Sequence, residues 1–563
     1  MSADPSKSPA TDASSSDSSA LRQLVARDVT RSFGARTVLA GVDLVATPGQ
    51  RIGLVGENGS GKSTLLRILA GVDHADGGDV QRPPDLAYLP QDPAFADGAT
   101  VGDVLRDALA PLHDMVAELE RLGSTLADVP AAADRYAETL DLAVARDAWD
   151  ADRRATVAAS RLGVDDLAAD RVVTELSGGQ RTRLALAALM TTRPSCALLD
   201  EPTNHLDDDA LGVLEEFLSD LPGVVVVASH DRVFLDRVCT AIVDLDPSLA
   251  GARSVAGRRY TGTFSDYLAA REDDRRRWEQ TYRDQQEELG DLRRTVAVDA
   301  RQVAHNRAPR DNDKYIYNFK AGNVARTISR RVRDAEQRLE RAEEGQVRKP
   351  PKPLAFRGAL TAVARSSGLA VTVRDLVVPG RVRVDRLDVG IGDQLLVTGP
   401  NGGGKSSLLA VLAGRLEAAS GSVSVSARRV GLLSQDVTFT DPAASARDTY
   451  AAALGVDRAE ARPLTELGLL HGRESVTAAG NLSVGQQRRL ALAILVAAQP
   501  DLLLLDEPTN HISLALAGEL EEGLGTSPGT VLVASHDRWL RRRWAGEVYP
   551  MDPRPDVSVG NVS

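Results

Sequence analysis

The chain contains two copies of one set of short motifs, and this repeat constrains the fold more than any other feature. The segment Gly56-Glu57-Asn58-Gly59-Ser60-Gly61-Lys62-Ser63 recurs as Gly399-Pro400-Asn401-Gly402-Gly403-Gly404-Lys405-Ser406. Lys62 and Lys405 are 343 positions apart, and Gln91 and Gln435 are 344 apart. Three later pairs share a spacing of 306: Ser177 with Ser483, Asp200 with Asp506, and His230 with His536. The first copy therefore holds 38 additional residues between Gln91 and Ser177.

Each glycine-rich segment has the spacing Gly-x-x-x-x-Gly-Lys-Ser, which is typical of a loop between a strand and a helix. The backbone N–H groups of such a loop surround nucleotide phosphates, and its lysine, Lys62 or Lys405, contacts the terminal phosphates. Its serine, Ser63 or Ser406, reaches Mg²⁺. We therefore expect two sites for ATP with Mg²⁺. The residues expected to bind ATP include both loops and the residue that follows each, Thr64 and Ser407.

An acidic pair ends an apolar strand in each copy: Asp200-Glu201 and Asp506-Glu507. Here the aspartate can hold the water shell of a metal ion, and the glutamate can polarise an attacking water. His230 and His536 stand in Ser-His-Asp-Arg after a further apolar strand, which favours contact with the γ-phosphate. Because both histidines have the same context at the same offset, we prefer this interpretation to that of two purely structural residues.

Apolar strands such as 51–55, 197–199 and 224–228 alternate with helical stretches, a pattern typical of a parallel sheet wrapped by helices. We expect an α/β fold with two nucleotide-binding domains in tandem, joined by a long helical hairpin. The predicted parts are a disordered tail (1–20), the first domain (21–264), the hairpin (265–349), the second domain (350–552) and a C-terminal tail (553–563). Within the first domain, helices at 104–126 and 131–158 are expected to form an inserted arm at about 95–165, in a region where acidic residues outnumber basic ones more than twofold.

The hairpin is strongly charged, and its two helical segments flank a break at 306–313. In the second segment, 325–344, apolar residues recur every three or four positions and form one seam for a partner helix. A plain antiparallel coiled-coil spacer is one interpretation. At the tip, however, aromatic residues lie between lysines, which gives stacking faces beside cations as RNA contacts require. The residues expected to meet RNA are Arg307, Arg310, Lys314, Tyr315, Tyr317, Phe319 and Lys320.

The net charge of −12 argues against a generic nucleic-acid-binding protein, but its distribution is uneven. Residues 293–333 hold eleven Arg or Lys against three acidic residues, a balance suited to phosphates. No apolar run approaches the roughly 20 residues needed to span a bilayer, and the polar start lacks the apolar core of a signal peptide. We expect a cytoplasmic protein. Cys196 and Cys239 lack paired spacing, so we expect reduced core thiols.

The segments Leu176-Ser-Gly-Gly-Gln180 and Leu482-Ser-Val-Gly-Gln486, with Gln91 and Gln435, resemble the signature segments and Q-loops of the ATP-binding cassette family. The resemblance implies two cassettes that face each other head to tail within a monomer. ATP binding would close the pair and hydrolysis would reopen it. One implied site combines Lys62, Glu201 and His230 with Ser483 and Gly485, and the other combines Lys405, Glu507 and His536 with Ser177 and Gly179.

The same resemblance implies roles for further residues. The signature residues would be Ser177, Gly178, Gly179, Gln180, Ser483, Val484, Gly485 and Gln486. The magnesium residues would be Ser63, Gln91, Asp200, Ser406, Gln435 and Asp506.

The two copies are not equal. Phe33 matches the aromatic residue that stacks on adenine in the family, whereas the second copy offers Val377, Val378 and Pro379. Asp207 matches the family's D-loop aspartate, but Ser513 stands at that place in the second copy, and Val484 replaces a signature glycine. We therefore predict unequal hydrolysis at the two sites.

Tandem cassettes, an inserted arm, a charged hairpin and the segment 260–267 together resemble the ABC-F family of ribosome-acting ATPases. This resemblance implies that the hairpin enters the E site of the bacterial ribosome. Its tip would approach rRNA and the P-site tRNA near the peptidyl-transferase centre, and the arm can touch the L1 stalk region. The segments 311–315, 332–339, 349–354 and 510–513 resemble the antibiotic-resistance branch. That branch implies protection of the ribosome from a macrolide, lincosamide or streptogramin-type drug, without drug transport.

Two other functions stay open at this point. A general ABC-F translation or ribosome-assembly factor would share the same architecture, and drug-dependent growth would separate it from a resistance protein. The ATPase subunit of a drug exporter, which would need a membrane partner, is disfavoured because an exporter needs no cationic, aromatic hairpin between its cassettes.

Overall fold

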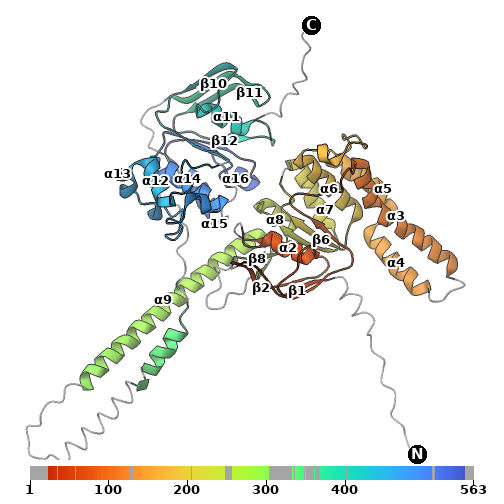
Figure 1. The fold of residues 1–563 in the computed structure, drawn as a ribbon, viewed down its shortest axis with the longest axis horizontal. Helices are drawn as coiled ribbons and strands as arrows, with labels where there is room; N and C mark the ends of the chain where they lie inside the picture. The colour runs from red at the N-terminus through yellow and green to blue at the C-terminus, as the bar shows by residue number, and fades with distance from the viewer. Residues whose placement is uncertain are drawn as a thin grey trace, which may run out of the picture. The chain divides into compact units, whose positions relative to one another are not determined.

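The computed structural model divides into two compact units (Figure 1). The first unit comprises Met1–Leu245, Gly257–Phe264 and Pro353–Ser563 and contains both cassettes; the second comprises Asp246–Ala256 and Ser265–Lys352 and is the linker. The structure describes residues 23–34, 36–56, 59–126, 132–204, 206–246, 257–303, 333–334, 336–347, 349, 360–361, 368–400, 402–435, 437–509, 514–525 and 527–551.

The first cassette is built on a six-stranded sheet in the order β5-β6-β7-β3-β8-β9. All neighbours pair in parallel except β8 and β9, which are antiparallel. Every residue of β6 and β7 is buried, which explains why both read as continuous apolar runs. The strands are β3 (Arg51–Val55), β5 (Leu86–Leu89), β6 (Cys196–Asp200), β7 (Val224–Ala228), β8 (Ala241–Asp244) and β9 (Arg258–Thr261).

An antiparallel sheet and four helices complete this cassette. The sheet has the order β2-β1-β4, with β1 (Leu24–Phe33), β2 (Arg36–Ala46) and β4 (Gly77–Gln81). The helices are α2 (Lys62–Ala70), α6 (Gly178–Thr192), α7 (Asp208–Asp220) and α8 (Arg232–Val238), with a 3₁₀ turn at Val173–Glu175.

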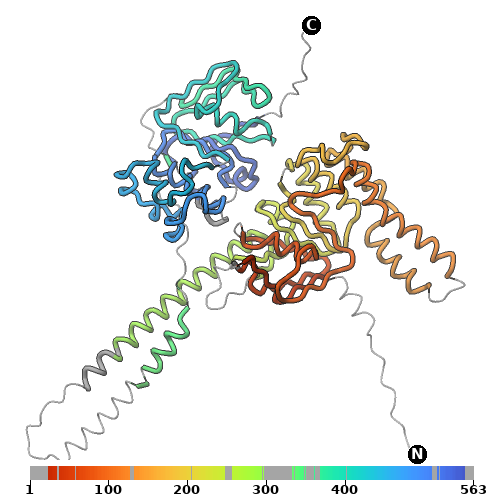
Figure 2. Tube along the Cα trace, viewed as in Figure 1, coloured from red at the N-terminus to blue at the C-terminus, as the bar shows by residue number. Residues whose placement is uncertain are grey.

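The inserted arm consists of α3 (Val101–Thr125), α4 (Ala132–Arg146) and α5 (Ala151–Arg161), and Figure 2 shows α3 and α4 side by side. A capping box at Thr100 begins α3. The single helix expected over 131–158 is wrong, because Asp147 adopts a left-handed conformation with φ 50° and a 3₁₀ turn follows at Ala148–Asp150. The Arg154 guanidinium holds this break by donating to the carbonyls of Asp147, at 2.5 Å, and Thr191, at 2.8 Å.

The second cassette repeats this plan with a five-stranded parallel sheet in the order β14-β15-β16-β12-β17 and an antiparallel sheet in the order β11-β10-β13. Its strands are β10 (Leu369–Val378), β11 (Val382–Gly390), β12 (Gln394–Thr398), β13 (Ser420–Val425), β14 (Val430–Leu433), β15 (Leu502–Asp506), β16 (Thr530–Ala534) and β17 (Glu547–Pro550). Its helices are α11 (Lys405–Leu412), α12 (Ala446–Leu454), α13 (Val456–Ala461), α14 (Val484–Ala498), α15 (Leu514–Gly525) and α16 (Arg538–Arg543), with 3₁₀ turns at Leu464–Glu466 and Ala479–Asn481. The predicted α/β fold with two tandem nucleotide-binding domains is confirmed.

The linker contains α9 (Phe264–Val303), and residues 336–344 are helical on its return. Contacts between described residues of the linker join these segments. Arg293 Nη2 lies 2.7 Å from Glu343 Oε1, and the Val347 N–H donates to Gln285 Oε1 at 2.8 Å. The predicted break at 306–313 and the RNA-contacting tip residues lie outside the described residues, so the tip contacts stay predictions.

Both cysteines are free and buried, as expected: Cys196 begins β6 and Cys239 follows α8. Burial raises the pKa of each thiol to about 12. Within the described part of the chain, every helix is too short or too polar to cross a lipid bilayer.

Two candidate ATP sites

Each glycine-rich loop connects a central strand, β3 or β12, to a helix whose first residue is the lysine. Gly61 and Gly404, at the junction, have φ 100° and 94°. A Cβ on Gly61 would lie 2.6 Å from Leu39 Cδ2, and one on Gly404 would lie 2.4 Å from the Arg381 carbonyl oxygen. Only glycine fits both the conformation and the space, so the loop keeps its backbone close to the path of a bound phosphate chain.

The two loop lysines are largely buried and fold back onto their own loops. Lys62 Nζ donates to the Gly56 carbonyl at 2.8 Å, and Lys405 Nζ donates to the Gly399 carbonyl at 2.9 Å. Burial lowers the pKa of Lys405, although Glu507 and Asp506 oppose this effect. Glu57, Asn58 and Asn401 of the loops lie outside the described residues. Contact between these loops and ATP stays a prediction that the geometry supports.

The residues predicted for magnesium lie at the carboxyl ends of neighbouring strands. Asp200 ends β6 and Asp506 ends β15, and both side chains are buried. Burial raises the pKa of each carboxyl group, against the hydrogen bond that Ser63 or Ser406 makes with it. Gln91 follows β5, which pairs with β6, and Gln435 follows β14, which pairs with β15. Each site thus brings carboxylate and hydroxyl oxygens together, and the expected glutamine follows the neighbouring strand at the same sheet edge.

This donor set fits Mg²⁺. Among the described residues, Oδ1 of Asp200 and Oδ1 of Asp506 are buried and have no hydrogen-bond partner. A buried carboxylate oxygen without a donor is costly unless a cation meets it, and Mg²⁺ prefers oxygen ligands. We therefore expect Asp200 with Ser63, and Asp506 with Ser406, to hold the ion that accompanies ATP.

The predicted catalytic glutamates occupy a strained backbone conformation. Glu201 and Glu507 have φ 49° and 47°, in the left-handed region. Their N–H groups donate to Ala228 at 2.8 Å and to Ala534 at 2.9 Å, so the neighbouring strand fixes each peptide. Non-glycine residues rarely adopt this conformation, and such strain is concentrated at functional sites.

The glutamate and histidine of each cassette lie together, but with different geometry. In the first cassette His230 Nε2 is 3.3 Å from Glu201 Oε1, and the His230 N–H donates to Glu201 Oε2 at 3.2 Å. In the second, His536 Nδ1 is 2.7 Å from Glu507 Oε1, and the Ser535 hydroxyl donates to Glu507 Oε2 at 3.1 Å. The hydrogen bond to Glu507 raises the pKa of His536. Glu507 is therefore held more tightly than Glu201.

Hydrolysis at the first site should depend on pH with a midpoint near neutrality. Burial raises the pKa of Glu201 to about 7, with Lys62 opposing the shift. A general base acts only when deprotonated, so the rate rises as pH increases through this pKa and falls below it. The measurement is the pH profile of ATP turnover from pH 5.5 to 9 in a Glu507→Gln background, which leaves the first site as the source of activity. A flat profile between pH 6 and 8 would contradict a raised pKa of Glu201 in the working enzyme.

The signature segments both begin a helix with a capping box. The Gln180 N–H donates to the Ser177 hydroxyl at 3.2 Å and the Ser177 N–H donates to Gln180 Oε1 at 3.0 Å. Ser483 and Gln486 repeat this arrangement at 3.3 and 2.9 Å. Val484, in the second segment, is 61% exposed. The pairing of each signature segment with the loop of the opposite cassette stays a prediction.

The predicted adenine contact differs between the copies in the structure. Phe33 ends β1, is 52% exposed, and has the Arg31 guanidinium 5.1 Å from its ring centroid. At the corresponding place β10 ends at Val378, which is buried. The first cassette therefore offers an accessible aromatic face. In the D-loops, Asp207 caps α7 through the Ala210 N–H at 2.9 Å, while 510–513 lie outside the described residues.

One residue at the second site was missed from the sequence. Arg488, on α14, is 2% exposed and donates to the backbone carbonyls of Asp506, at 2.7 Å, and Glu507, at 2.8 Å. The matching position of the first cassette is Thr182, whose hydroxyl donates to the Gly178 carbonyl. The sequence carried little signal for this burial, because Arg488 stands in the polar run Gln486-Gln487-Arg488-Arg489 at the start of α14.

Comparisons with known proteins agree with this geometry. The ABC transporter family matches residues 39–204 and 383–510. The tylosin resistance ATP-binding protein TlrC of Streptomyces fradiae is 39% identical over 537 residues, which cover 93% of this chain and 96% of that protein. The energy-dependent translational throttle protein EttA of Escherichia coli K12 is 31% identical over 551 residues, with coverage of 94% and 92%.

Two solved structures share the fold at low identity. The archaeal ribosome recycling factor aABCE1, in complex with the stalk protein aP1, has a TM-score of 0.52 and 18% identity, covering 91% of this chain and 85% of its own. The RNase-L inhibitor has a TM-score of 0.50 and 17% identity, with the same coverage. Together with the full-length relatives and the duplicated motifs, these findings show that the chain belongs to the ABC-F family of tandem ATP-binding cassette ATPases.

Proposed function

We propose that this ATPase protects the bacterial ribosome from a drug that binds at the peptidyl-transferase centre or the exit tunnel. With ATP bound, a monomer in the cytoplasm occupies the E site, and the linker tip meets rRNA and the P-site tRNA. The drug, of the macrolide, lincosamide or streptogramin type, is displaced as the tip reshapes its surroundings. Hydrolysis then releases the protein, so ATP acts as the timer of a binding cycle.

The observation that carries this proposal is the 39% identity to a tylosin resistance protein across 93% of this chain and 96% of that relative. Such coverage extends into both the linker and the arm. The charge of the linker is a second support. Eleven basic residues against three acidic ones between 293 and 333 favour a polyanion in a chain whose net charge is −12.

The residues of each site account for ATP hydrolysis and for the change between the ATP-bound and released states. Mg²⁺, when bound by Asp200 and Ser63 or by Asp506 and Ser406, would neutralise charge on the β- and γ-phosphates. Glu201 and Glu507 accept a proton from the attacking water, and their neighbouring histidines hold that carboxylate in position. The histidine loops, the turns that carry His230 and His536, contact the glutamate of their own cassette. Loss of the γ-phosphate therefore changes the surroundings of these loops.

A general translation factor is the second candidate, since the EttA relative is 31% identical with 92% coverage of its own length. The two candidates share ribosome binding and differ in their response to drugs. Expression in a drug-sensitive host separates them. Protection predicts a several-fold higher inhibitory concentration for tylosin and no change for a drug that acts on the small subunit. Equal growth with and without the gene at every tylosin concentration would favour the translation factor.

Ribosome binding should require ATP in a protein that cannot hydrolyse it. We expect the Glu201→Gln, Glu507→Gln double variant to sediment with bacterial ribosomes in the presence of ATP and to stay in the supernatant without it. The matched control is Glu216→Gln, Glu522→Gln, which removes the same charge from exposed positions with the same 306-residue offset. That control should pellet only weakly with ATP, because it still completes the cycle. Failure of the double variant to pellet with ATP would overturn the ribosome as target and favour an exporter subunit.

A further inference from the structure

Two arginines at equivalent positions of the two cassettes each form an ion pair with a glutamate of the other cassette. Arg232 and Arg538 are 306 residues apart, as are Glu215 and Glu521. Arg232 Nη1 of the first cassette lies 2.9 Å from Glu521 Oε1 of the second. Reciprocally, Arg538 Nη2 of the second lies 2.6 Å from Glu215 Oε1 of the first. Each cassette thus gives one arginine and receives one.

Each of these glutamates also forms an ion pair with a second arginine, which belongs to the same cassette as the glutamate. Arg237 Nη1 lies 2.6 Å from Glu215 Oε2, and Arg543 Nη1 lies 3.7 Å from Glu521 Oε2. These arginines are again 306 residues apart. Each glutamate therefore divides its two oxygens between its own cassette and the opposite one. We call this set of six side chains the exchange cluster.

Burial separates the two cross-cassette pairs of the exchange cluster from ordinary surface ion pairs, whereas Arg237 and Arg543 are 51% and 63% exposed. The side chains of Arg232 and Glu521 are 6% and 5% exposed, and those of Arg538 and Glu215 are 10% and 9% exposed. A nearby pair, Arg541 with Asp208, also joins the cassettes but is 30% and 57% exposed. Exposed pairs contribute little, whereas a buried charge that loses its partner is strongly unfavourable. Separating the buried pairs is therefore unfavourable, so a movement of one cassette at these pairs is followed by the other.

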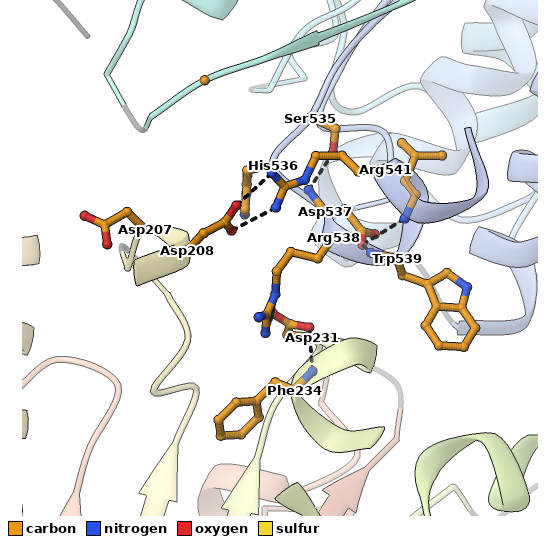
Figure 3. A network of polar contacts seen from close by, with 12 residues as sticks. Asp207, Asp208, Asp231, Phe234, Ser535, His536, Asp537, Arg538, Trp539 and Arg541 are labelled. Carbon is orange, nitrogen blue, oxygen red and sulfur yellow. Dashed lines mark hydrogen bonds and ion pairs between the residues drawn. The ribbon is translucent and has the colours of Figure 1, made fainter. Parts of the chain in front are cut away.

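The exchange cluster is connected to both ATP sites. Arg538 stands two residues after His536, and Glu215 lies on α7, the helix that follows Glu201 in the chain. Arg538 also holds Asp231, the residue next to His230, with Nη2 at 2.9 Å (Figure 3). A single arginine of the second cassette thus contacts both the histidine loop and the α7 helix of the first.

The reciprocal arginine, Arg232, contacts an aromatic pair within the first unit. The Arg232 guanidinium lies 5.9 Å from the ring of Trp539, and that ring packs edge-on against Phe264 with centroids 6.3 Å apart. Phe264 is fully buried and is the first residue of α9. A buried aromatic contact of the first unit therefore adjoins the exchange cluster.

We propose that the exchange cluster couples the two ATP sites, with Arg538 and Arg232 as positioning residues. Each arginine fixes the histidine loop of its own cassette to the α7 or α15 helix of the other. A shift of one histidine loop on ATP binding is passed to the glutamate-bearing segment opposite, so occupancy of one site changes the ATP affinity of the other. The coupling rests on the cassette fold and on ATP binding, and it does not depend on the ribosomal target.

The test measures this coupling in the full chain with hydrolysis blocked by Glu201→Gln, Glu507→Gln. Calorimetric titration with MgATP gives the affinity of the first site with the second intact and with the second disabled by Lys405→Ala. Coupled sites in proteins change each other's affinity by about 5- to 150-fold. We expect a ratio in this range, which Arg538→Met reduces to below twofold. The affinity of the first site in the Lys405→Ala background stays within about twofold, because Arg538 does not touch the nucleotide loops.

Two matched variants make the result specific. Arg538→Lys keeps the buried charge and should retain most of the coupling. Arg541→Met removes a less buried arginine of the same helix, 30% exposed, and should leave the ratio unchanged. A full ratio in Arg538→Met, or an equal loss in Arg541→Met, would overturn the proposal. Should Arg538→Met fail to fold, as judged by thermal unfolding, Arg232→Met tests the reciprocal pair by the same titration, with the same expected loss.

Discussion

Glu201→Gln lowers steady-state ATP turnover by about a hundredfold, and Glu507→Gln lowers it by less than about threefold. This is the expected result if the first site performs most of the hydrolysis. The amide of glutamine fills the space of the carboxylate but cannot take a proton from water. General base catalysis contributes about 10²- to 10⁴-fold, so the site that carries the turnover loses nearly all of it.

The inequality follows from how the two carboxylates are held. The pKa of Glu201 is raised to about 7 by burial, which suits proton transfer near neutral pH. Glu507 accepts a hydrogen bond from the Ser535 hydroxyl at 3.1 Å and lies 2.7 Å from His536 Nδ1, so water must compete for its oxygens. The first cassette also presents the exposed ring of Phe33, where the second ends its strand at a buried valine.

Phosphate release by each single variant, at saturating MgATP, is the measurement. Both variants should keep wild-type ATP affinity, because the glutamates act on water and not on the nucleotide loops. Glu216→Gln, an exposed neighbour of the exchange cluster paired with Arg161, is the charge control and should retain full turnover. Equal losses from Glu201→Gln and Glu507→Gln would show that both sites turn over at one rate and would contradict the inequality.

Much of the fold and of the candidate sites could be predicted because the informative residues are local in sequence. An apolar run of four residues followed by Asp-Glu predicts both a buried strand and the place where its carboxylates lie, as β6 and β15 show. The glycine-rich loops and the capping residues Ser177 and Ser483 likewise depend on neighbours within eight positions. Such patterns fix local structure before any tertiary contact forms.

The features that were missed depend on partners far along the chain. The break at Asp147 is held by Arg154, whose second carbonyl partner is Thr191, and helix periodicity alone does not contain that contact. The exchange cluster joins residues some 300 positions apart. The sequence does contain an Arg and a Glu that recur at the 306-residue offset. The offset alone, however, does not show that each arginine pairs with the glutamate of the opposite cassette.

Arg488→Thr should cost the second cassette about 3 to 5 kcal/mol of unfolding free energy and should leave the first cassette folded. The change gives the second cassette the residue that the first has at position 182. Arg488 is 2% exposed and donates to the carbonyls of Asp506 and Glu507. Threonine is too short to reach them, so two buried carbonyls lose this donor and a cavity replaces the guanidinium.

Thermal unfolding followed by calorimetry measures this loss. The unfolding transition of the second cassette should move to a lower temperature and separate from that of the first cassette. Arg458→Thr, an exposed position on α13, is the matched control and should leave the transition in place. A loss below about 1 kcal/mol would mean that the two carbonyls find other donors, and the assigned role would be wrong. Below the unfolding transition of its second cassette, Arg488→Thr should bind MgATP normally at the first site. Arg488 holds only the backbone of Asp506 and Glu507. The first cassette has Thr182 at the equivalent position and holds its own Asp-Glu pair without this arginine.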